Sequence, residues 1–219
     1  MAGPDQGQAT DPKAREGLRI NNVIMAVRDL SETSERLLSE YGLQSSVVPY
    51  SYGITMHVMD VGGNQFLELM GAHDPESEEA RQLAKVVEHG DRLLQWEVRT
   101  GDIEQVARRL NRQPLERKYL AEDGRILDSW RTLRDDSGWR CELPPFVQYD
   151  QPNRVEPPEI VTTEKGTTLT GFAWLEVGGS KRALLDWLGG SGVPLRFVTG
   201  SPGPKAVAIT SSEGEIVIG

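Results

Sequence analysis

A strand that runs directly into an amphipathic helix occurs three times along this chain, and this repeat is the feature that most constrains the fold. The three copies begin with apolar segments at residues 23–30, 94–100 and 173–180. Their separation far exceeds the roughly 20 to 50 residues of solenoid or propeller repeats, so each copy should be a small module with its own strands. We therefore predict an α+β fold with three βαβββ modules in series.

Local composition suggests where these modules begin and end. Residues 1–17 are polar, contain Gly and Pro and lack periodicity, which predicts a disordered tail. Residues 18–150 have room for two modules, and residues 151–166 contain three prolines and read as a linker. The third module is expected over residues 167–219.

The charge balance limits the kinds of partner that the protein can have. The chain has 24 Lys and Arg against 33 Asp and Glu, a net charge of -9. Nucleic acids and anionic membranes are bound largely through positive surface, so we expect neither and favour a small-molecule ligand. The single Cys141 has no partner for an internal disulfide, and no apolar stretch approaches the roughly 20 residues of a membrane span or resembles a signal peptide. These features predict a cytoplasmic protein.

The first two opening strands have one apolar and one mixed face, because side chains alternate along a strand. The apolar faces should contact the helices, whereas the mixed faces suit a cup-shaped ligand cavity better than a sealed core. The apolar faces are Val23, Met25, Val27 and Leu94, Trp96, Val98; the mixed faces are Asn22, Ile24, Ala26, Arg28 and Leu93, Gln95, Glu97, Arg99.

Several short motifs resemble those of one known superfamily. They are the segment 20–30, ending Ala-Val-Arg-Asp-Leu; Phe66-Leu67-Glu68-Leu69; the segment 94–100; Trp130-Arg131; and the segment 145–149. With them the chain resembles the vicinal oxygen chelate superfamily, and within it the bacterial glyoxalase-like domain proteins. The resemblance covers residues 18–150, and it implies that the first two modules pair to close one cup, with the third module as a continuation.

The superfamily usually builds a divalent-metal site from the first and last strands of two paired modules. Carried over position by position, the four ligand places fall on Asn22, Glu68, Leu93 and Gln148. Only Glu68 is a usual ligand, because leucine has no donor atom and amides offer only neutral oxygens. Glu97 lies about 13 Å beyond Leu93 along the strand and is not expected to replace it. We predict no tightly bound metal and no other cofactor, with a weak divalent cation at Glu68 left open.

Glu68 is the first candidate for catalysis. It stands between Leu67 and Leu69, which should face the helix, so its carboxylate should point into the cup, where partial burial would raise its pKa towards the range of a general base. The alternative is a structural carboxylate paired with Arg131. Asn22 and Gln148 would lie nearby and could hold a ligand carbonyl or hydroxyl, or could instead satisfy each other or water.

The remaining candidates have weaker support. His57, inside a predicted strand, could act as a general acid or base, although a lone strand histidine is more often structural. Gln95, Glu97 and Arg131 are expected to line the cup as substrate-binding residues.

Two functions are therefore open. The first is an isomerase, epimerase or lyase that binds a small oxygenated organic molecule and uses Glu68 to move a proton next to a carbonyl. The second is a non-catalytic protein that sequesters its ligand, as the antibiotic-binding members of the superfamily do.

An unpaired third module would leave a face without a partner. Its inward side chains would be Phe172, Trp174 and Glu176, and two large aromatic side chains left in water would form an apolar patch. The third module could pack on the first two as a lid, or pair with its copy in a symmetric homodimer. We favour the dimer at this stage.

Overall fold

The computed structural model describes residues 17–49, 53–74, 76–120, 126–135, 142–149, 158–190 and 192–219. The predicted tail, apart from Gly17, the first part of the predicted linker (151–157) and Cys141 lie outside these ranges. No helix of the described ranges is long and apolar enough to cross a membrane.

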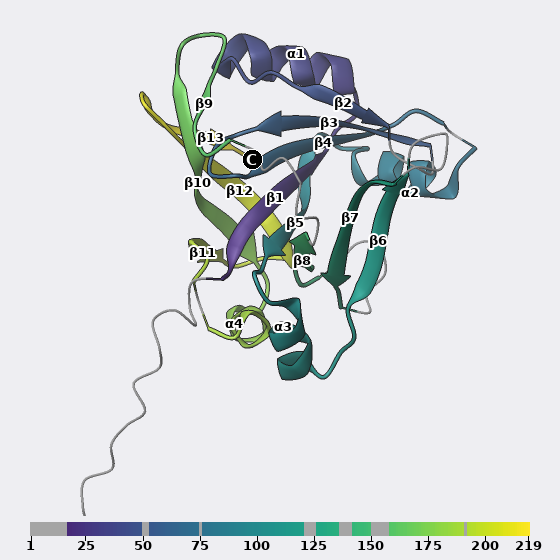
Figure 1. The fold of residues 1–219 in the computed structure, drawn as a ribbon. Coiled ribbons are helices and arrows are strands. Elements are labelled where there is room, and N and C mark those ends of the chain that lie inside the picture. Colours follow the sequence, from purple (N-terminus) through teal and green to yellow (C-terminus); the bar gives the residue numbers. More distant parts are fainter. Residues whose placement is uncertain are drawn as a thin grey trace, which may run out of the picture.

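The first two modules form one eight-stranded sheet, as predicted. Its strand order is β2-β3-β4-β1-β5-β8-β7-β6, so that the opening strands of the two modules, β1 and β5, lie antiparallel at the centre. The curled sheet and its helices are visible in Figure 1. The elements are β1 (Arg19–Ala26), α1 (Leu30–Tyr41), β2 (Ser46–Pro49), β3 (Ile54–Asp60) and β4 (Phe66–Ala72), then α2 (Glu78–Val86), then β5 (Arg92–Arg99), α3 (Ile103–Leu110), β6 (Leu115–Leu120), β7 (Ile126–Leu133) and β8 (Phe146–Tyr149).

The helices of both modules start at equivalent capping residues. Asp29 accepts a hydrogen bond from the backbone N–H of Glu32 at 2.9 Å, and Asp102 accepts one from the N–H of Gln105 at the same distance. These bonds satisfy donors that the first turn of a helix leaves free. Gly42 ends α1 in the left-handed conformation, with φ of 72°.

The two faces of this sheet carry different clusters of apolar side chains. On the outer face, Leu67, Trp96 and other strand residues pack with α1 and α3 in the main core. On the inner, concave face, a smaller cluster joins Ile24 and Met70 to Leu83 of α2. The connector between the two modules therefore covers part of the cup.

The C-terminal unit has the predicted βαβββ order along the chain but its own strand arrangement. Its sheet has the order β11-β10-β12-β13, with β9 on β10. In the C-terminal unit, β11 follows α4 and pairs in parallel with the opening strand β10. In the first module, the opening strand β1 instead pairs in parallel with the last strand, β4. The elements are β9 (Val161–Thr162), β10 (Thr168–Gly178), α4 (Lys181–Leu188), β11 (Leu195–Val198), β12 (Gly203–Ser211) and β13 (Gly214–Ile218).

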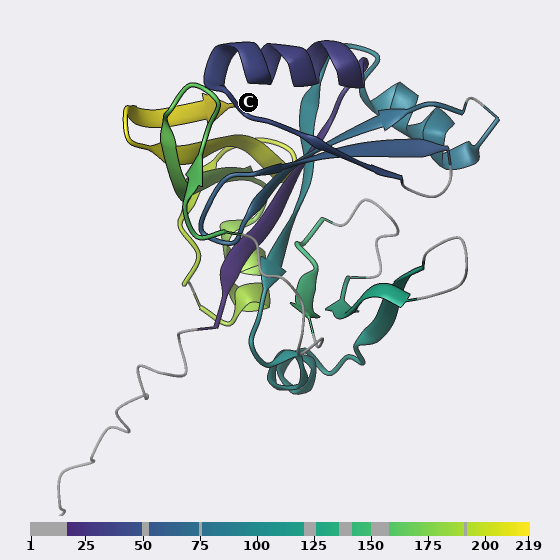
Figure 2. The ribbon, with the colours of Figure 1, turned by 45° about the horizontal axis from the view of Figure 1, so that its top comes forward.

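The C-terminal unit packs on the outer face of the large sheet, away from the cup (Figures 1 and 2). Gln65 connects the two sheets, since its Nε2 donates to the Ile20 carbonyl at 2.8 Å and its Oε1 accepts from the Phe172 N–H at 2.6 Å. Trp187 of α4 donates to the Pro144 carbonyl at 2.9 Å. The C-terminal unit therefore packs on the first two modules, as one of the two expected outcomes had it, but on the outer face and not as a lid on the cup.

A bulge in β10 explains why Phe172 and Trp174 do not share one inward face. The pairing of β10 with β12 shifts between these two residues, so that Phe172 is buried against the large sheet and Trp174 points outward. Arg196 covers the Trp174 ring at 3.7 Å, and Glu215 accepts from its indole N–H at 2.8 Å. Phe172 and Trp174 therefore do not form the exposed aromatic pair that favoured a dimer, and the homodimer stays a prediction without that support.

Candidate functional site

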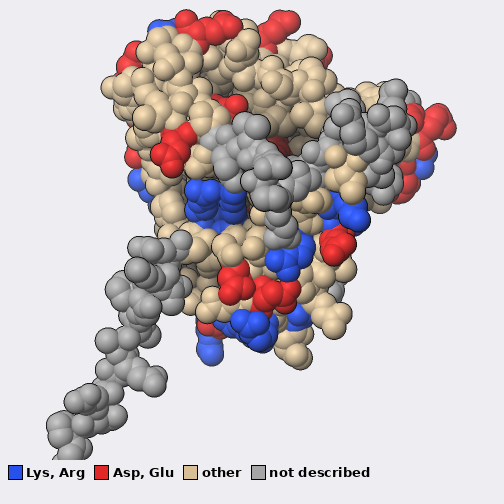
Figure 3. All heavy atoms as spheres, viewed as in Figure 1, with Lys and Arg blue, Asp and Glu red and all other residues tan. Residues whose placement is uncertain are grey.

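Two glutamates and an asparagine lie side by side on the concave face, on three neighbouring strands. Asn22 of β1 is directly opposite Glu97 of β5, and Glu68 of β4 is in register with Ile24 of β1. Figure 3 shows that the surface is hollowed in front of β4, β1 and β5, with an acidic side chain visible in the hollow. Both glutamates are half-buried. We call Glu68 and Glu97 the carboxylate pair, and Asn22 the bridging amide.

Both carboxyl groups of this pair hold their proton up to neutral pH. Burial raises the pKa of Glu68 from 4.5 to about 7, and the nearby charge of Glu97 adds to the shift, while a hydrogen bond from Asn22 opposes it. Burial also raises the pKa of Glu97 to about 7, against the opposing effects of Arg134 and of hydrogen bonds from Asn22 and Asn21. Groups with such values can accept and return protons at neutral pH.

A bulge at the start of β1 brings two consecutive asparagines to the same site. The pairing with β5 shifts between Ile20 and Asn22, so that both Asn21 and Asn22 approach Glu97 instead of facing opposite sides. Asn21 also donates from Nδ2 to the Tyr149 hydroxyl at 3.2 Å. Both amides are nearly inaccessible, at 1% and 4% exposure.

The oxygens of these two amides are unusual for buried polar atoms. Within the part of the chain that the structure describes, neither Asn21 Oδ1 nor Asn22 Oδ1 has a hydrogen-bond partner. A buried acceptor without a donor costs about 1–3 kcal/mol. A ligand that brings an O–H or N–H group to these oxygens would recover that free energy.

Aromatic and basic side chains border the site on the side of β8. Arg99 lies over the Tyr149 ring at 5.2 Å, and the rings of Trp130 and Tyr149 are 6.4 Å apart. Gln95, predicted to line the cup, is buried opposite Ile24 on the concave face. Asn21 and Tyr149 were missed from the sequence, although two consecutive asparagines in an otherwise apolar strand were a signal for the first.

Two predicted site residues, Gln148 and Arg131, lie on the outer face instead. Gln148 accepts from the Ile103 N–H at 2.8 Å and donates to the Gly101 carbonyl at 3.1 Å, so it holds the start of α3. Arg131 donates to Glu104 of α3 at 2.6 Å and to Gln148 at 3.3 Å. These contacts take Arg131 and Gln148 away from Glu68, and they also remove the alternative in which Arg131 neutralises Glu68.

His57 is also separated from the carboxylate pair. Its Nδ1 lies 3.1 Å from Ser34 Oγ of α1, and Ser34 in turn bonds Ser45 at 2.7 Å. Glu68 belongs to the opposite face of the sheet. The structure therefore does not bring His57 together with the candidate base.

A second bulge exchanges the positions of Leu93 and Leu94. The register between β1 and β5 shifts after Ile24, so Leu93 joins the outer core and Leu94 packs against the concave cluster. The expectation that Leu93 faces the cup is wrong. So is the conclusion that Glu97 is too distant, because Glu97 itself lies opposite Asn22.

The donor atoms at this site do not fit the usual metal of such a fold. The site offers two carboxylates and two amide oxygens, but zinc, iron and nickel prefer sites that include imidazole or thiolate. Among the residues that the structure describes, no three His, Cys, Asp or Glu side chains gather in a way that could hold a metal ion. These oxygen donors suit a hard divalent cation such as Mg²⁺ better than zinc, iron or nickel.

Paired βαβββ modules whose opening strands meet at the centre of one sheet define the vicinal oxygen chelate class. Residues 21–188 match the family model described as a glyoxalase-like domain. The chain belongs to this glyoxalase-like domain family, and the match continues into the C-terminal unit.

The solved structures with similar folds include methylmalonyl-CoA epimerases. The enzyme from Mycobacterium tuberculosis is 20% identical, covering 63% of this chain and 96% of the enzyme, with a TM-score of 0.44. A Streptomyces coelicolor variant in complex with 2-nitronate-propionyl-CoA is 16% identical, covering 62% of this chain and all of the enzyme, with a TM-score of 0.45. No curated protein matches the chain.

Proposed function

We propose that this protein is an isomerase, epimerase or lyase that moves a proton next to the carbonyl group of a small oxygenated molecule. The observation that carries the proposal is the carboxylate pair, Glu68 and Glu97, with both pKa values near 7 on one concave face. A pair of this kind holds both an acid and a base at neutral pH.

The proposed reaction uses the two glutamates in opposite protonation states. The ionised one takes a proton from the carbon next to the carbonyl, whose electrons move onto the carbonyl oxygen to give an enol or enolate. The protonated one then donates a proton. Return to the opposite side of the same carbon gives an epimer, return to a neighbouring atom gives an isomer, and loss of a leaving group gives elimination. General acid–base catalysis of this type contributes about 10²- to 10⁴-fold in rate.

The bridging amide and its neighbour have supporting roles in this proposal. Asn22 hydrogen bonds to both glutamates and lowers the pKa of each, which stabilises whichever carboxylate is ionised. The free oxygens of Asn21 and Asn22 would accept hydrogen bonds from hydroxyl or amine groups of the substrate. We propose further that the reaction needs no tightly held metal.

Exchange of substrate hydrogen with solvent tests the proposal without knowledge of the product. Chiral 2-substituted carbonyl compounds are incubated with the protein in D₂O, and deuterium incorporation is followed by NMR. We expect incorporation into at least one compound, with a loss of 10²-fold or more in Glu68→Gln and in Glu97→Gln. The control is Glu35→Gln, on the exposed side of α1, which should keep the full rate.

Retained exchange in both glutamine variants would contradict the proposal. The sequestration function makes a different prediction, namely that wild-type and both variants bind a compound and that none of them exchanges its hydrogen.

A further inference from the structure

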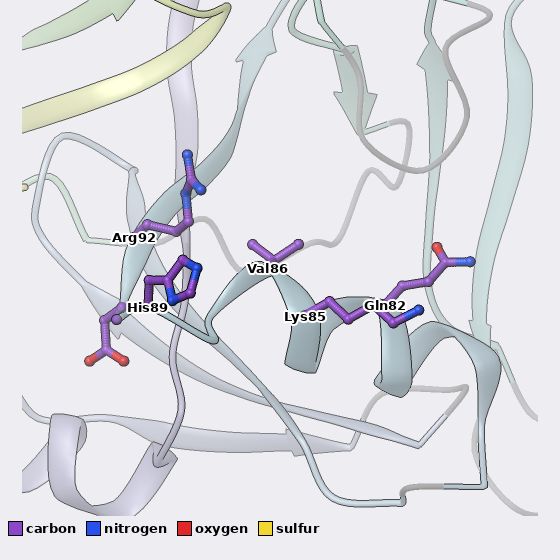
Figure 4. A pocket seen from close by; sticks show the side chains of 7 residues that line it. Gln82, Lys85, Val86, His89 and Arg92 are labelled. Carbon is purple, nitrogen blue, oxygen red and sulfur yellow. The ribbon is translucent and has the colours of Figure 1, made fainter.

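A second hollow lies on the same concave side, at the far end of β5. It has a volume of about 590 Å³ and is bordered by the last turns of α2 and by the turn that leads into β5. Figure 4 shows Val86, Lys85 and Gln82 on the helix, and His89 and Arg92 on the turn and strand. This basic hollow has no part in the proton transfer described above.

Three basic side chains border it in a protein whose net charge is -9. The charge of Lys85 helps to lower the pKa of Glu78 on the same helix. Within the described ranges, Lys85, His89 and Arg92 form no close ion pair and no side-chain hydrogen bond. Lys85 and Arg92 keep their positive charge at neutral pH by their ordinary chemistry. A basic cluster of this kind attracts anions.

Asp91 is the carboxylate in the lining of the hollow, and both of its oxygens accept hydrogen bonds from residues outside the lining. Asp91 accepts from the Arg28 N–H through Oδ1 at 2.9 Å and from the Thr33 hydroxyl through Oδ2 at 2.9 Å. Both bonds hold its side chain against the junction of β1 and α1. The two oxygens of Asp91 are therefore directed at that junction, although the residue also borders the hollow.

The hollow and the carboxylate pair lie along the same face of β5. Arg92 is paired with Ala26, which packs with α2 in the concave cluster. Leu94, which packs against the same cluster, lies on β5 between Arg92 and Glu97. Five strand residues span about 16 Å, so one extended molecule can reach both places.

We propose that the basic hollow is an anion-binding subsite that holds a phosphate or carboxylate group of the ligand. Arg92 supplies paired N–H donors in a planar fork, Lys85 supplies a point charge, and His89 supplies a ring N–H donor. This inference rests on the proposed function. Together they give the substrate class as an extended anionic carbonyl compound whose charged end lies about 15 Å from the reacting carbon.

The test measures anion binding directly by calorimetry, with inorganic pyrophosphate in one arm and succinate in the other. Wild-type protein is expected to bind at least one of them, which decides between phosphate and carboxylate. Arg92→Gln and Lys85→Gln should each weaken that binding at least fivefold. Arg182→Gln, on the exposed surface of α4, is the matched control and should bind as wild-type does.

Lack of binding of both anions by the wild-type protein, or equal binding by the Arg92 and Lys85 variants, would overturn the subsite. Both side chains are exposed, so their replacement should leave the melting temperature unchanged. Glu68→Gln should retain anion binding. This result separates the two proposals, because proton exchange can fail while the subsite stands, and the reverse also holds.

Discussion

At the scale of single residues, the site depends on carboxylates that are costly to bury. Glu68 and Glu97 lie on β4 and β5, the two strands on either side of β1, and Asn22 of β1 hydrogen bonds to both. Each carboxyl group resists ionisation in this environment. Such a pair lowers stability at neutral pH, which makes a purely structural role a poor explanation for it. Strongly shifted carboxylates in a hollow are typical of functional sites.

The cost has a defined pH dependence. An unfolded glutamate titrates near 4.5, whereas these groups titrate near 7 in the folded protein. Between these values the folded state holds protons that the unfolded state has lost, so the contribution of each group to stability falls as pH rises from about 4.5 to 7. Below this window the penalty is absent, and above it the penalty is complete.

Glu68→Gln should therefore stabilise the protein at alkaline pH. We expect a gain of about 2 kcal/mol at pH 8, less than the whole shift implies because the side chain keeps some contact with water. The gain should shrink towards zero at pH 4.5. Urea unfolding at both pH values measures it, with Glu35→Gln as control, and an equal effect at both values would contradict the shifted pKa.

At the scale of elements, the repeat could be predicted from the sequence, but strand faces could be predicted only where strands are regular. Glu68 follows simple alternation in β4 and was placed correctly on the concave face. Leu93 and Trp174 were placed on the wrong faces, because each lies beside a bulge that moves the following side chains to the other side. Gly171, with φ of 109°, is a sequence signal for the irregular stretch of β10, whereas no glycine stands beside the shift at Leu93.

Gln148 and Arg131 were misplaced for another reason. Their polarity indicated the cup, but the start of α3 also needs acceptors for its free N–H groups, and Gln148 fulfils that need. Sequence alone does not decide between a ligand and a helix end as the partner of such an amide. The same ambiguity applies to His57, which bonds Ser34 of α1.

The contact between the two sheets depends on Gln65. Its side chain is 9% exposed and bonds the backbones of β1 and β10 at once. Gln65→Leu would leave the Ile20 carbonyl and the Phe172 N–H buried without partners, at an expected cost of about 2–4 kcal/mol. Thermal and urea unfolding measure this loss, with Gln113→Leu on the surface as the control. A variant as stable as wild-type would show that the bridge does not hold the sheets together.

At the scale of the whole molecule, the C-terminal unit and the candidate site occupy opposite sides of the large sheet (Figure 2). Residues of β12, including Val207 and Ile209, share the outer core with Val23 and Trp96 of the central strands. The unit thus supports from behind the strands that carry Asn22 and Glu97, and it leaves the concave face open to a ligand. The pairing of modules in one chain completes the cup without a second subunit.

The central claim is that Glu68 and Glu97 exchange protons at neutral pH, and a carbon-13 NMR titration of the glutamate carboxyl groups tests it most directly. The signals are assigned with Glu68→Gln and Glu97→Gln. We predict that two carboxyl groups titrate near pH 7, and that Glu97→Gln moves the pKa of Glu68 down towards 4.5, because the neighbouring negative charge is gone. Titration of every glutamate near pH 4.5 in the wild-type protein would contradict this account.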